Sequence, residues 1–185
     1  MEQSKPLLDW HGEPLVRHMA RTALAAQFAE VVVVTGHAGD AVARALHTLP
    51  VRVVHNPRHA EGMSTSLIAG FQALAATSQA AAVLLVDQPL ITTALLDLVL
   101  AAAAEHPDQV VAPVWNGQRG NPIVFPRRFW ELIWALSGDQ GARRAVATLG
   151  AALHLVPVDT DAVVRDADTP EQYAGLVGMS PGASM

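Results

Sequence analysis

Hydrophobic and polar residues follow two alternating periods along this chain. Short apolar runs, typical of strands buried on both faces, occur at 31–34, 51–54, 83–86 and 109–113. Apolar residues recur every three or four positions, as in amphipathic helices, over 14–28, 40–49, 63–76 and 94–105. Since strands alternate with helices, the pattern predicts an α/β fold in which helices cover both faces of a mostly parallel sheet.

The pattern is less regular after residue 114. The turn-rich segment 115–122 precedes an apolar run at 123–125, which predicts either a hairpin-like insertion or an antiparallel edge strand. Further elements are predicted as helices over 127–136 and 142–149, a last strand over 154–158 and a closing helix over 170–177, capped by Thr169. We expect one domain over 1–177 and a flexible tail over 178–185.

Composition excludes several classes of protein. Of the 185 residues, 51% are hydrophobic and 16% are charged, which is typical of a compact domain. The net charge is −5 and the 12 Lys and Arg are scattered, so we expect no nucleic-acid partner. Without cysteine the chain has no disulfide and no thiolate metal site. The apolar runs are too short to cross a bilayer and no signal pattern is present, so we expect a cytoplasmic protein without a membrane partner.

Asp87 is the first candidate for chemistry. It follows the apolar run 83–86 and precedes Gln88 and Pro89, so it lies at the carboxyl end of a predicted strand. Ligands of open α/β sheets bind at such ends, and a carboxylate there can hold a cation on a phosphate. The alternative is that Asp87 caps the helix that begins near Thr92 or Thr93. The local pattern leaves both interpretations open.

Lys5 and Asp168 are candidate partners of Asp87. Carboxylates from two strand ends suit Mg²⁺ when substrate phosphates complete its octahedron, and a lysine can neutralise a polyphosphate. Each residue also has a simpler interpretation: Lys5 as a solvated side chain, and Asp166 or Asp168 as a helix-start signal before Pro170.

Two loops are further candidates. Gly62, Ser64 and Ser66 begin a predicted helix and offer backbone donors and hydroxyls to an oxygen-rich ligand, although they also suit an ordinary helix start. The segment 117–121, with Arg119 between glycines, suits either a mobile loop that closes over a ligand or an exposed hairpin.

Three other patterns carry less weight. The turn at 36–39 lacks the third glycine of a dinucleotide fingerprint. His55 and His59 flank Asn56-Pro57, which prevents the regular helix that a zinc-binding histidine pair of this spacing needs. No Gly-x-Ser-x-Gly elbow is present, so hydrolase chemistry is not favoured.

Taken together, the ordered motifs resemble one family, the nucleotidyltransferases that act on the molybdenum cofactor, and especially its cytidylyltransferase branch. The resemblance covers nearly the whole chain to about residue 177. Its motifs lie at 5–8, 31–37, 56–67, 87–89, 112–122, 138–143 and 166–171.

The resemblance implies a three-layer Rossmann-like fold and transfer of CMP, or another nucleoside monophosphate, from a nucleoside triphosphate to the phosphate of molybdopterin. CTP is favoured over GTP as donor, Mg²⁺ is the implied cofactor, and a recipient molybdoenzyme or its chaperone is a possible partner. By the same resemblance, Asp87 and Asp168 would bind the metal and Lys5 would contact the triphosphate. The residues implied to bind the nucleotide are Gly62, Ser64, Ser66, Gln88 and Pro89. The loop on the acceptor side is Arg119, Gly120 and Asn121.

The chain departs from the family pattern at its start. Family members open with a strand and a glycine-rich phosphate-binding loop; this chain begins at the methionine of that motif and has Glu2 in place of a glycine. Val86 and Asn121 also replace a common glycine and a common histidine. Either the native polypeptide is longer or this is a shortened paralogue. We favour the first, because loss of a central strand exposes two strand edges, and we expect this exact chain to be a poor enzyme.

Two alternative functions stay open. One is nucleotide transfer to another small acceptor, such as a sugar phosphate or an isoprenoid-precursor phosphate. The other is a non-catalytic protein that carries molybdenum cofactor to an apo-enzyme.

Overall fold

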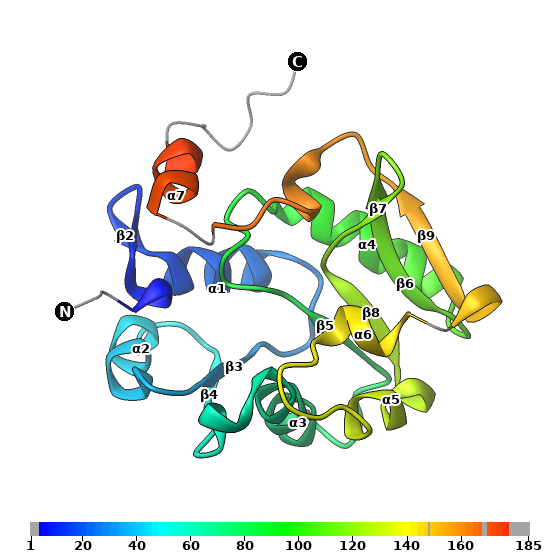
Figure 1. Cartoon of the computed structure of the whole chain (residues 1–185), viewed down its shortest axis with the longest axis horizontal. Coiled ribbons are helices and arrows are strands. Elements are labelled where there is room, and N and C mark those ends of the chain that lie inside the picture. The colour runs from blue at the N-terminus through cyan, green and yellow to red at the C-terminus, as the bar shows by residue number, and fades with distance from the viewer. Residues whose placement is uncertain (1–3, 148, 168–169, 178–185) are drawn as a thin grey trace.

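The computed structural model describes residues 4–147, 149–167 and 170–177, and its elements follow the predicted alternation of helices and strands (Figure 1). The helices are α1 (Leu15–Ala25), α2 (Gly39–Leu46), α3 (Met63–Ala73), α4 (Thr93–Glu105), α5 (Glu131–Trp134), α6 (Ala142–Ala145) and α7 (Pro170–Val177). The strands are β1 (Asp9–Trp10), β2 (Glu13–Pro14), β3 (Val32–Thr35), β4 (Arg52–His55), β5 (Ala80–Val83), β6 (Val110–Trp115), β7 (Gln118–Arg119), β8 (Ile123–Pro126) and β9 (Leu153–Pro157). Within the described ranges, no helix is both long and apolar enough to span a membrane.

The strands that carry the core form two sheets. β3 and β4 pair in parallel as a two-stranded sheet, and the larger sheet has the order β5-β8-β6-β7 with β9 added on β6. In the larger sheet β5, β6 and β9 run in one direction, while β7 and β8 run in the opposite direction. The α/β fold class predicted from the sequence is confirmed.

β8 takes a more central place than the sequence suggests. It lies between β5 and β6 and is antiparallel to both, so it is an interior strand and not an edge strand. Its four residues, Ile123–Pro126, are all buried. An interior position removes all four apolar residues from water and pairs the backbone on both edges of the strand. The interior position is therefore more stable than the predicted edge position.

β5 begins and ends earlier than predicted. The strand spans Ala80–Val83, and the apolar residues 84–86 continue beyond it. Its ladder with β8 ends at the pair Val83 and Ile123, and none of the described residues pairs with the other edge of β5. Because a strand requires a partner, the chain leaves the sheet after Val83 and enters a turn at Val86 and Asp87.

Helices cover both faces of the larger sheet. Phe71 of α3 and Ile133 of α5 pack with Phe125 on one face, and Val99 of α4 packs with Val124 on the other. Phe125 and Val124 are neighbours on β8, and their opposite orientations are those expected of successive strand residues. The result is a three-layer arrangement of helix, sheet and helix.

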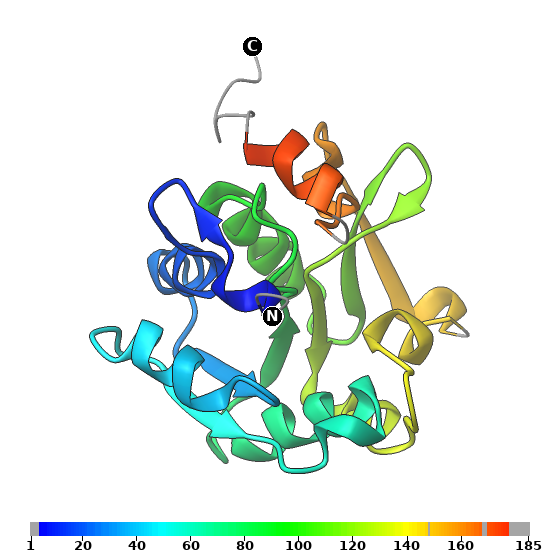
Figure 2. The same ribbon diagram turned by 60° about the vertical axis from the view of Figure 1, so that its left-hand side comes forward.

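The two ends of the described chain lie side by side. The β1–β2 hairpin lies beside α7 in both ribbon views (Figures 1 and 2). Trp10 and Leu15 pack against Leu176, and the hydroxyl of Tyr173 donates a hydrogen bond to the carbonyl of Asp9. Burial, and to a lesser extent the charge of Asp9, raises the pKa of Tyr173, so this phenol stays protonated as a donor near neutral pH.

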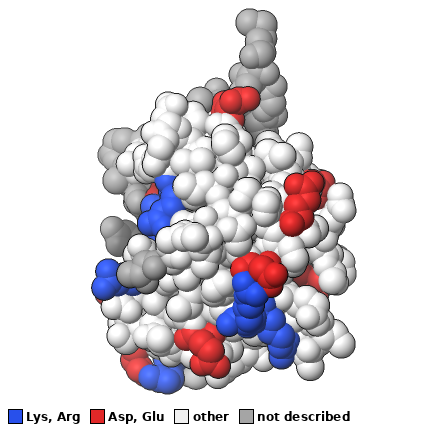
Figure 3. Space-filling view, turned by 90° about the vertical axis from the view of Figure 1, so that its right-hand side faces the viewer, with Lys and Arg blue, Asp and Glu red and all other residues white. Residues whose placement is uncertain are grey.

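Charged side chains are dispersed on the face seen in Figure 3. Acidic and basic residues lie next to one another there, and most of the surface carries neither. This face therefore lacks the continuous basic stripe that nucleic acid needs.

Candidate active site

Lys5 and Asp87 form the centre of the site. The Lys5 ammonium lies 3.3 Å from Oδ2 of Asp87, and their side chains are 35% and 21% exposed. Lys5 starts a short 3₁₀ helix, η1 (Lys5–Leu7), in which Pro6 suits the first turn. Leu7 packs against the apolar cluster under α1 and α2, which fixes the segment that carries Lys5. Two residues singled out from the sequence are thus brought together.

Asp87 does not cap the following helix. The cap of α4 is Thr92, whose hydroxyl accepts a hydrogen bond from the backbone N–H of Leu95 at 3.2 Å. This removes the simpler interpretation of Asp87, because its carboxylate is directed to Lys5 and not to the helix.

The segment before α7 is attached directly to Asp87. The backbone N–H of Ala167 donates to the Asp87 carbonyl at 2.8 Å. Asp166 lies next to it, and its Oδ1 accepts a hydrogen bond from Nε2 of Gln88 at 2.6 Å. The predicted metal ligand Asp168 lies outside the described residues, so its placement at the site stays a prediction. Asp166 is the acidic residue of this segment that the structure does describe.

Gln88 and Pro89 are more buried than a nucleotide-binding role suggests. Gln88 is 0% exposed, and its Nε2 also donates to the Val163 carbonyl at 3.3 Å. Pro89 is buried, and its carbonyl lies 3.0 Å from Nε2 of His18. Their direct contact with a nucleotide stays a prediction. In the structure both residues hold neighbouring segments in place around Asp87.

Gly62 gives the start of α3 its shape. It has φ 117° and ψ 170°, a conformation that only glycine adopts readily. A Cβ at Gly62 would lie 2.2 Å from the carbonyl carbon of Gly138, so the two loops approach more closely than any side chain allows. The contact includes a hydrogen bond from the N–H of Ser64 to the Gly138 carbonyl at 3.0 Å.

Asn56 organises the same loop, and sequence reasoning assigned it no role. Asn56 is only 3% exposed, and its side-chain Nδ2 donates hydrogen bonds to the hydroxyls of Thr65 and Ser66 at 2.8 and 3.0 Å. Its Oδ1 accepts from the N–H of Arg58. The available signal was an asparagine followed by proline at the end of a strand, a combination that favours side-chain bonds to the next turn. The Ser66 hydroxyl is therefore held in place by Asn56. Ser64, in contrast, is buried, at 1% exposed.

The segment that carries Arg119 is a hairpin. Trp115 pairs with Gln118 across a two-residue turn in which Asn116 and Gly117 have φ of 48° and 79°, as a type I′ turn requires. Arg119 donates to the Val146 carbonyl at 3.2 Å. The segment is a hairpin in the structure, and its closure over a ligand stays a prediction.

Gly120 and Asn121 are fixed below that turn. The N–H of Asn121 donates to the Val163 carbonyl at 2.9 Å, and a Cβ at Gly120 would lie 2.3 Å from that oxygen. Asn121 is 1% exposed. Its Nδ2 and the Oε1 of Gln88 are buried without a hydrogen-bond partner in the structure. The Asn121 backbone N–H and the Gln88 Nε2 both donate to the Val163 carbonyl. The unpaired donor, Asn121 Nδ2, and the unpaired acceptor, Gln88 Oε1, therefore belong to the two residues that share this carbonyl.

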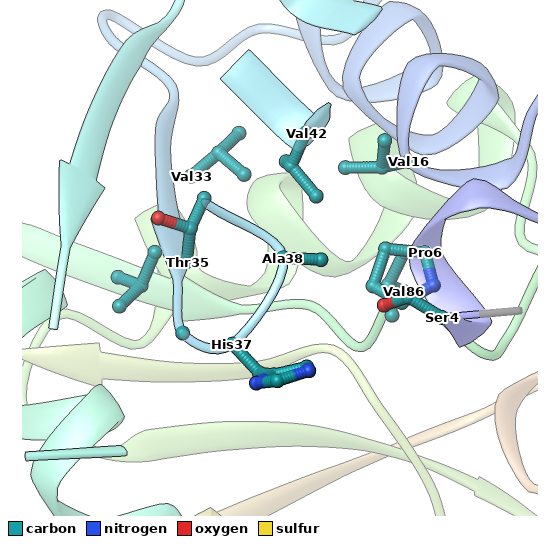
Figure 4. Close-up of a pocket in the computed structure, with 11 residues that line it drawn as sticks. Ser4, Pro6, Val16, Val33, Thr35, His37, Ala38, Val42 and Val86 are labelled. Carbon is teal, nitrogen blue, oxygen red and sulfur yellow. The ribbon is translucent and has the colours of Figure 1, made fainter. Parts of the chain in front are cut away.

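A cavity of about 170 Å³ adjoins Lys5 and Asp87 (Figure 4). Ser4 and Pro6 line it on either side of Lys5 in sequence, and Val86 lines it just before Asp87. Its opposite wall is the carboxyl end of β3 and the turn into α2. The ion pair thus lies at the border of a space that is lined by η1, α1, β3, the start of α2 and Val86.

The arrangement can bind phosphate and a hard cation. Asp87 supplies oxygen ligands and Lys5 a positive charge, while the described residues contain no cluster of three or more His, Cys, Asp or Glu suited to a metal. Mg²⁺ usually takes one or two carboxylates and completes its shell with water and substrate phosphates. A site with one described carboxylate beside a lysine fits that requirement.

The family model of the MobA-like NTP transferase domain matches residues 1–155. Nicotine blue oxidoreductase of Paenarthrobacter nicotinovorans is 30% identical over 181 residues, covering 94% of this chain and 87% of that protein. Molybdenum cofactor cytidylyltransferase of Escherichia coli is 25% identical over 175 residues, with 94% and 86% covered.

Solved structures share the fold. Rv0371c of Mycobacterium tuberculosis has a TM-score of 0.82 at 22% identity, with 97% of this chain and 92% of that chain covered. A second structure of that protein contains manganese, with a TM-score of 0.81 at 21% identity and coverage of 95% and 92%. A CMP:2-keto-3-deoxy-manno-octonic acid synthetase in complex with CTP has a TM-score of 0.75 at 16% identity, with 94% and 90% covered.

Proposed function

We propose, because the chain belongs to the MobA-like NTP transferase family, that it transfers CMP from CTP to the phosphate of molybdopterin and releases pyrophosphate. The family makes it a nucleotidyltransferase; the base, the acceptor and the metal are our proposal. The observation that carries it is the 3.3 Å pair of Lys5 and Asp87 beside the Ala167 contact.

The reaction needs no nucleophile from the protein. A phosphate oxygen of the acceptor attacks the α-phosphorus of CTP, the bond from that phosphorus to the bridging oxygen breaks, and pyrophosphate leaves with the electron pair. Catalysis can therefore come from positioning and charge neutralisation. In our proposal the Lys5 ammonium faces the triphosphate oxygens and offsets their negative charge.

Asp87 and Asp168 are the residues that would hold Mg²⁺. When bound, the ion neutralises charge on the phosphate oxygens of the donor. The Asp87 carboxylate accepts a hydrogen bond from the Lys5 ammonium and is only partly exposed. Its orientation is therefore fixed before a ligand binds. The manganese in the related Rv0371c structure supports a divalent cation in this fold.

The names of two relatives support the choice of CTP and acceptor. One curated relative is a molybdenum cofactor cytidylyltransferase, and one structural neighbour is a CMP-sugar-acid synthetase with CTP bound. The second name also favours another candidate acceptor, a small sugar-type molecule. A third relative is called an oxidoreductase, which makes a test with NADH and NADPH a necessary control.

The test is pyrophosphate release by the full chain with CTP or GTP, Mg²⁺ or Mn²⁺, and either molybdopterin or a sugar phosphate. We expect slow release with CTP and molybdopterin, because this exact chain is expected to be a poor enzyme, and a further loss of at least about a hundredfold in Asp87→Asn. Asp108→Asn is the matched control, because Asp108 is an exposed carboxylate that also pairs with a cation. Equal activity of Asp87→Asn and the parent would refute the role of Asp87. Release only with the sugar phosphate would select the second acceptor.

A further inference from the structure

The buried amide of Gln88 joins two segments that lie far apart in the sequence. Its Nε2 donates hydrogen bonds to Oδ1 of Asp166 at 2.6 Å and to the Val163 carbonyl at 3.3 Å. Gln88 is 0% exposed, so water does not compete for the amide. Because a carboxylate and a carbonyl only accept hydrogen bonds, the NH₂ group is the part of the amide that must face both of them. The orientation of the Gln88 side chain is therefore determined.

A backbone hydrogen bond joins the same two segments one residue further along. The N–H of Ala167 donates to the Asp87 carbonyl at 2.8 Å. Asp87 thus contacts Ala167, and Gln88 contacts Asp166, so the order of the contacts is antiparallel and the register is defined. Ala167 is 2% exposed and packs with the buried Trp10, which leaves it little room to shift.

The hydrogen bond between Gln88 and Asp166 does most to hold this register. A hydrogen bond to an ionised carboxylate is shorter and about twice as strong as one between neutral groups. The second partner of the amide, Val163, is held independently, because its carbonyl also accepts a hydrogen bond from the Asn121 N–H at 2.9 Å. The Gln88 amide is thus anchored at Val163, and from that anchor it holds the half-buried Asp166.

The register of these contacts limits where the next residue of the chain can lie. Asp168, the second carboxylate of the proposed cation site, follows Ala167 directly in the sequence and lies outside the described residues. Mg²⁺ demands near-ideal octahedral geometry with ligands at about 2.0–2.1 Å. Two carboxylates from different segments can therefore bind it together only if the segments are held in a fixed register.

We propose that Gln88 is a positioning residue of the cation site. Its amide keeps the segment before Asp168 in register with Asp87, so that both carboxylates bind one cation. The inference rests on the proposed function, from which it takes the assignment of Asp87 and Asp168 to the cation. It gives Gln88 a role that needs no contact with the nucleotide, which suits a side chain with no exposed surface. Groups that orient metal ligands in this way commonly set the affinity of a site for its metal.

The experiment measures the binding of Mn²⁺ to the full chain, without nucleotide or acceptor, from the electron paramagnetic resonance signal of the free ion. We expect Gln88→Glu, which removes the donor and sets a second carboxylate against Asp166, to raise the Kd for Mn²⁺ by at least about tenfold. The double variant Gln88→Glu/Asp166→Asn exchanges donor and acceptor and should recover at least about threefold of that loss. Gln88→Leu, which removes the donor without adding a charge, should also weaken binding and keeps the test decisive if Gln88→Glu fails to fold. An unchanged Kd, or no recovery in the double variant, would overturn the proposal.

Amide hydrogen exchange tests the register without any metal. In Gln88→Leu the N–H of Ala167 should exchange at least about tenfold faster, because the side chain no longer holds its segment. The N–H of Gly120, which donates to the Pro113 carbonyl at 2.9 Å, is the control and should exchange at the rate of the parent. An unchanged rate at Ala167 would refute the proposal whether or not the chain transfers nucleotide.

Two further variants separate positioning from a contribution to stability alone. Val99→Ala opens a cavity in the core beneath α4, so it should destabilise the fold and leave the Kd for Mn²⁺ unchanged. In an Asp168→Asn background, Gln88→Glu should weaken binding no further, because the ligand that it positions is already lost. An undiminished loss in that background would mean that Gln88 acts through other groups, against the proposal.

Failure of this inference can be told from failure of the proposed function. If Asp87→Asn weakens Mn²⁺ binding and Gln88→Glu does not, the role of Gln88 alone is refuted. If neither variant changes the Kd, the cation site of the proposed function is refuted, and the inference with it.

Discussion

The Lys5 ammonium and the Asp87 carboxylate lie 3.3 Å apart although 82 residues separate them in the sequence. Both side chains are partly exposed, so their mutual attraction contributes little to folding, about 0–1 kcal/mol. A pair that contributes little to stability is available to act on a ligand.

Replacement of Lys5 should therefore separate activity from stability. We expect Lys5→Met to lower kcat/KM for CTP by about a hundredfold, because the charge that we propose to face the triphosphate is lost, and to change the free energy of unfolding by less than about 1 kcal/mol. Steady-state kinetics and urea unfolding measure the two quantities. Arg128→Met, which breaks an exposed ion pair elsewhere, is the control and should retain full activity.

Gln88 should matter more for stability than its polar side chain suggests. We expect Gln88→Leu to lower the free energy of unfolding by about 1–2 kcal/mol, because Asp166 and Val163 lose a buried donor. Urea unfolding provides the measurement. Gln109→Leu removes a comparable hydrogen bond at the surface, to Ala151, and should cost less than about 0.5 kcal/mol. Equal effects of the two replacements would contradict the support that we assign to Gln88.

Gly62 and Gly117 should differ although both have positive φ. The space that a Cβ would occupy at Gly117 is open, so Gly117→Ala should cost only the backbone strain, about 1 kcal/mol. In Gly62→Ala the methyl group would also overlap the Gly138 peptide, and we expect a loss of about 3 kcal/mol or more. Thermal unfolding followed by circular dichroism gives both values. A similar melting temperature for the two variants would show that the Gly138 loop moves freely.

Glu30 should give the chain an acid-sensitive contact. Its carboxylate accepts hydrogen bonds from the Ala75 N–H at 2.7 Å and the Ser78 hydroxyl at 2.8 Å, and these bonds, the Ala75 bond foremost, hold the pKa of Glu30 below its usual range. The resulting stabilisation is fully present above the ordinary glutamate pKa of about 4.3 and is lost as pH falls through the lower folded value.

The variant Glu30→Gln tests this. We expect it to lower the free energy of unfolding by about 1 kcal/mol at pH 7 and to converge with the parent as pH falls below the folded pKa of Glu30. Urea unfolding at pH values from about 3 to about 7 measures the difference in unfolding free energy, because this interval spans the usual range of glutamate pKa values. A constant difference across that range would mean that the charge of Glu30 plays no part.

The sequence was informative wherever local periodicity decides the structure. The helix α1 has an apolar face that matches its buried side, and Lys5 and Asp87 were grouped because a lysine and a carboxylate together suit a metal-bound polyphosphate. The central place of β8 was not predictable in the same way. Strand order depends on which apolar surfaces fit across the sheet, and the buried run Ile123–Pro126 is equally compatible with an edge or a centre until its partners are known.

Burial of polar groups was also beyond the sequence. Gln88 and Asn121 stand in motifs that suggest exposed binding loops, yet both hydrogen-bond to the Val163 carbonyl from buried positions. That contact joins segments that are far apart in the sequence, and the residues near Gln88 or Asn121 do not predict it. Asp166 was considered as a helix-start signal, and its bond to Gln88 depends on the same long-range contact.

The attachment of both Lys5 and Ala167 to Asp87 has a consequence during protein synthesis. The residue that we place at the centre of the reaction receives one neighbour, Lys5, from 82 residues earlier in the sequence and another, Ala167, from well after it. A nascent chain can form β3, β4 and the helices around them early, since domains fold progressively as they are synthesised. The triphosphate site that we propose is therefore completed only after the segment around Ala167 has been made.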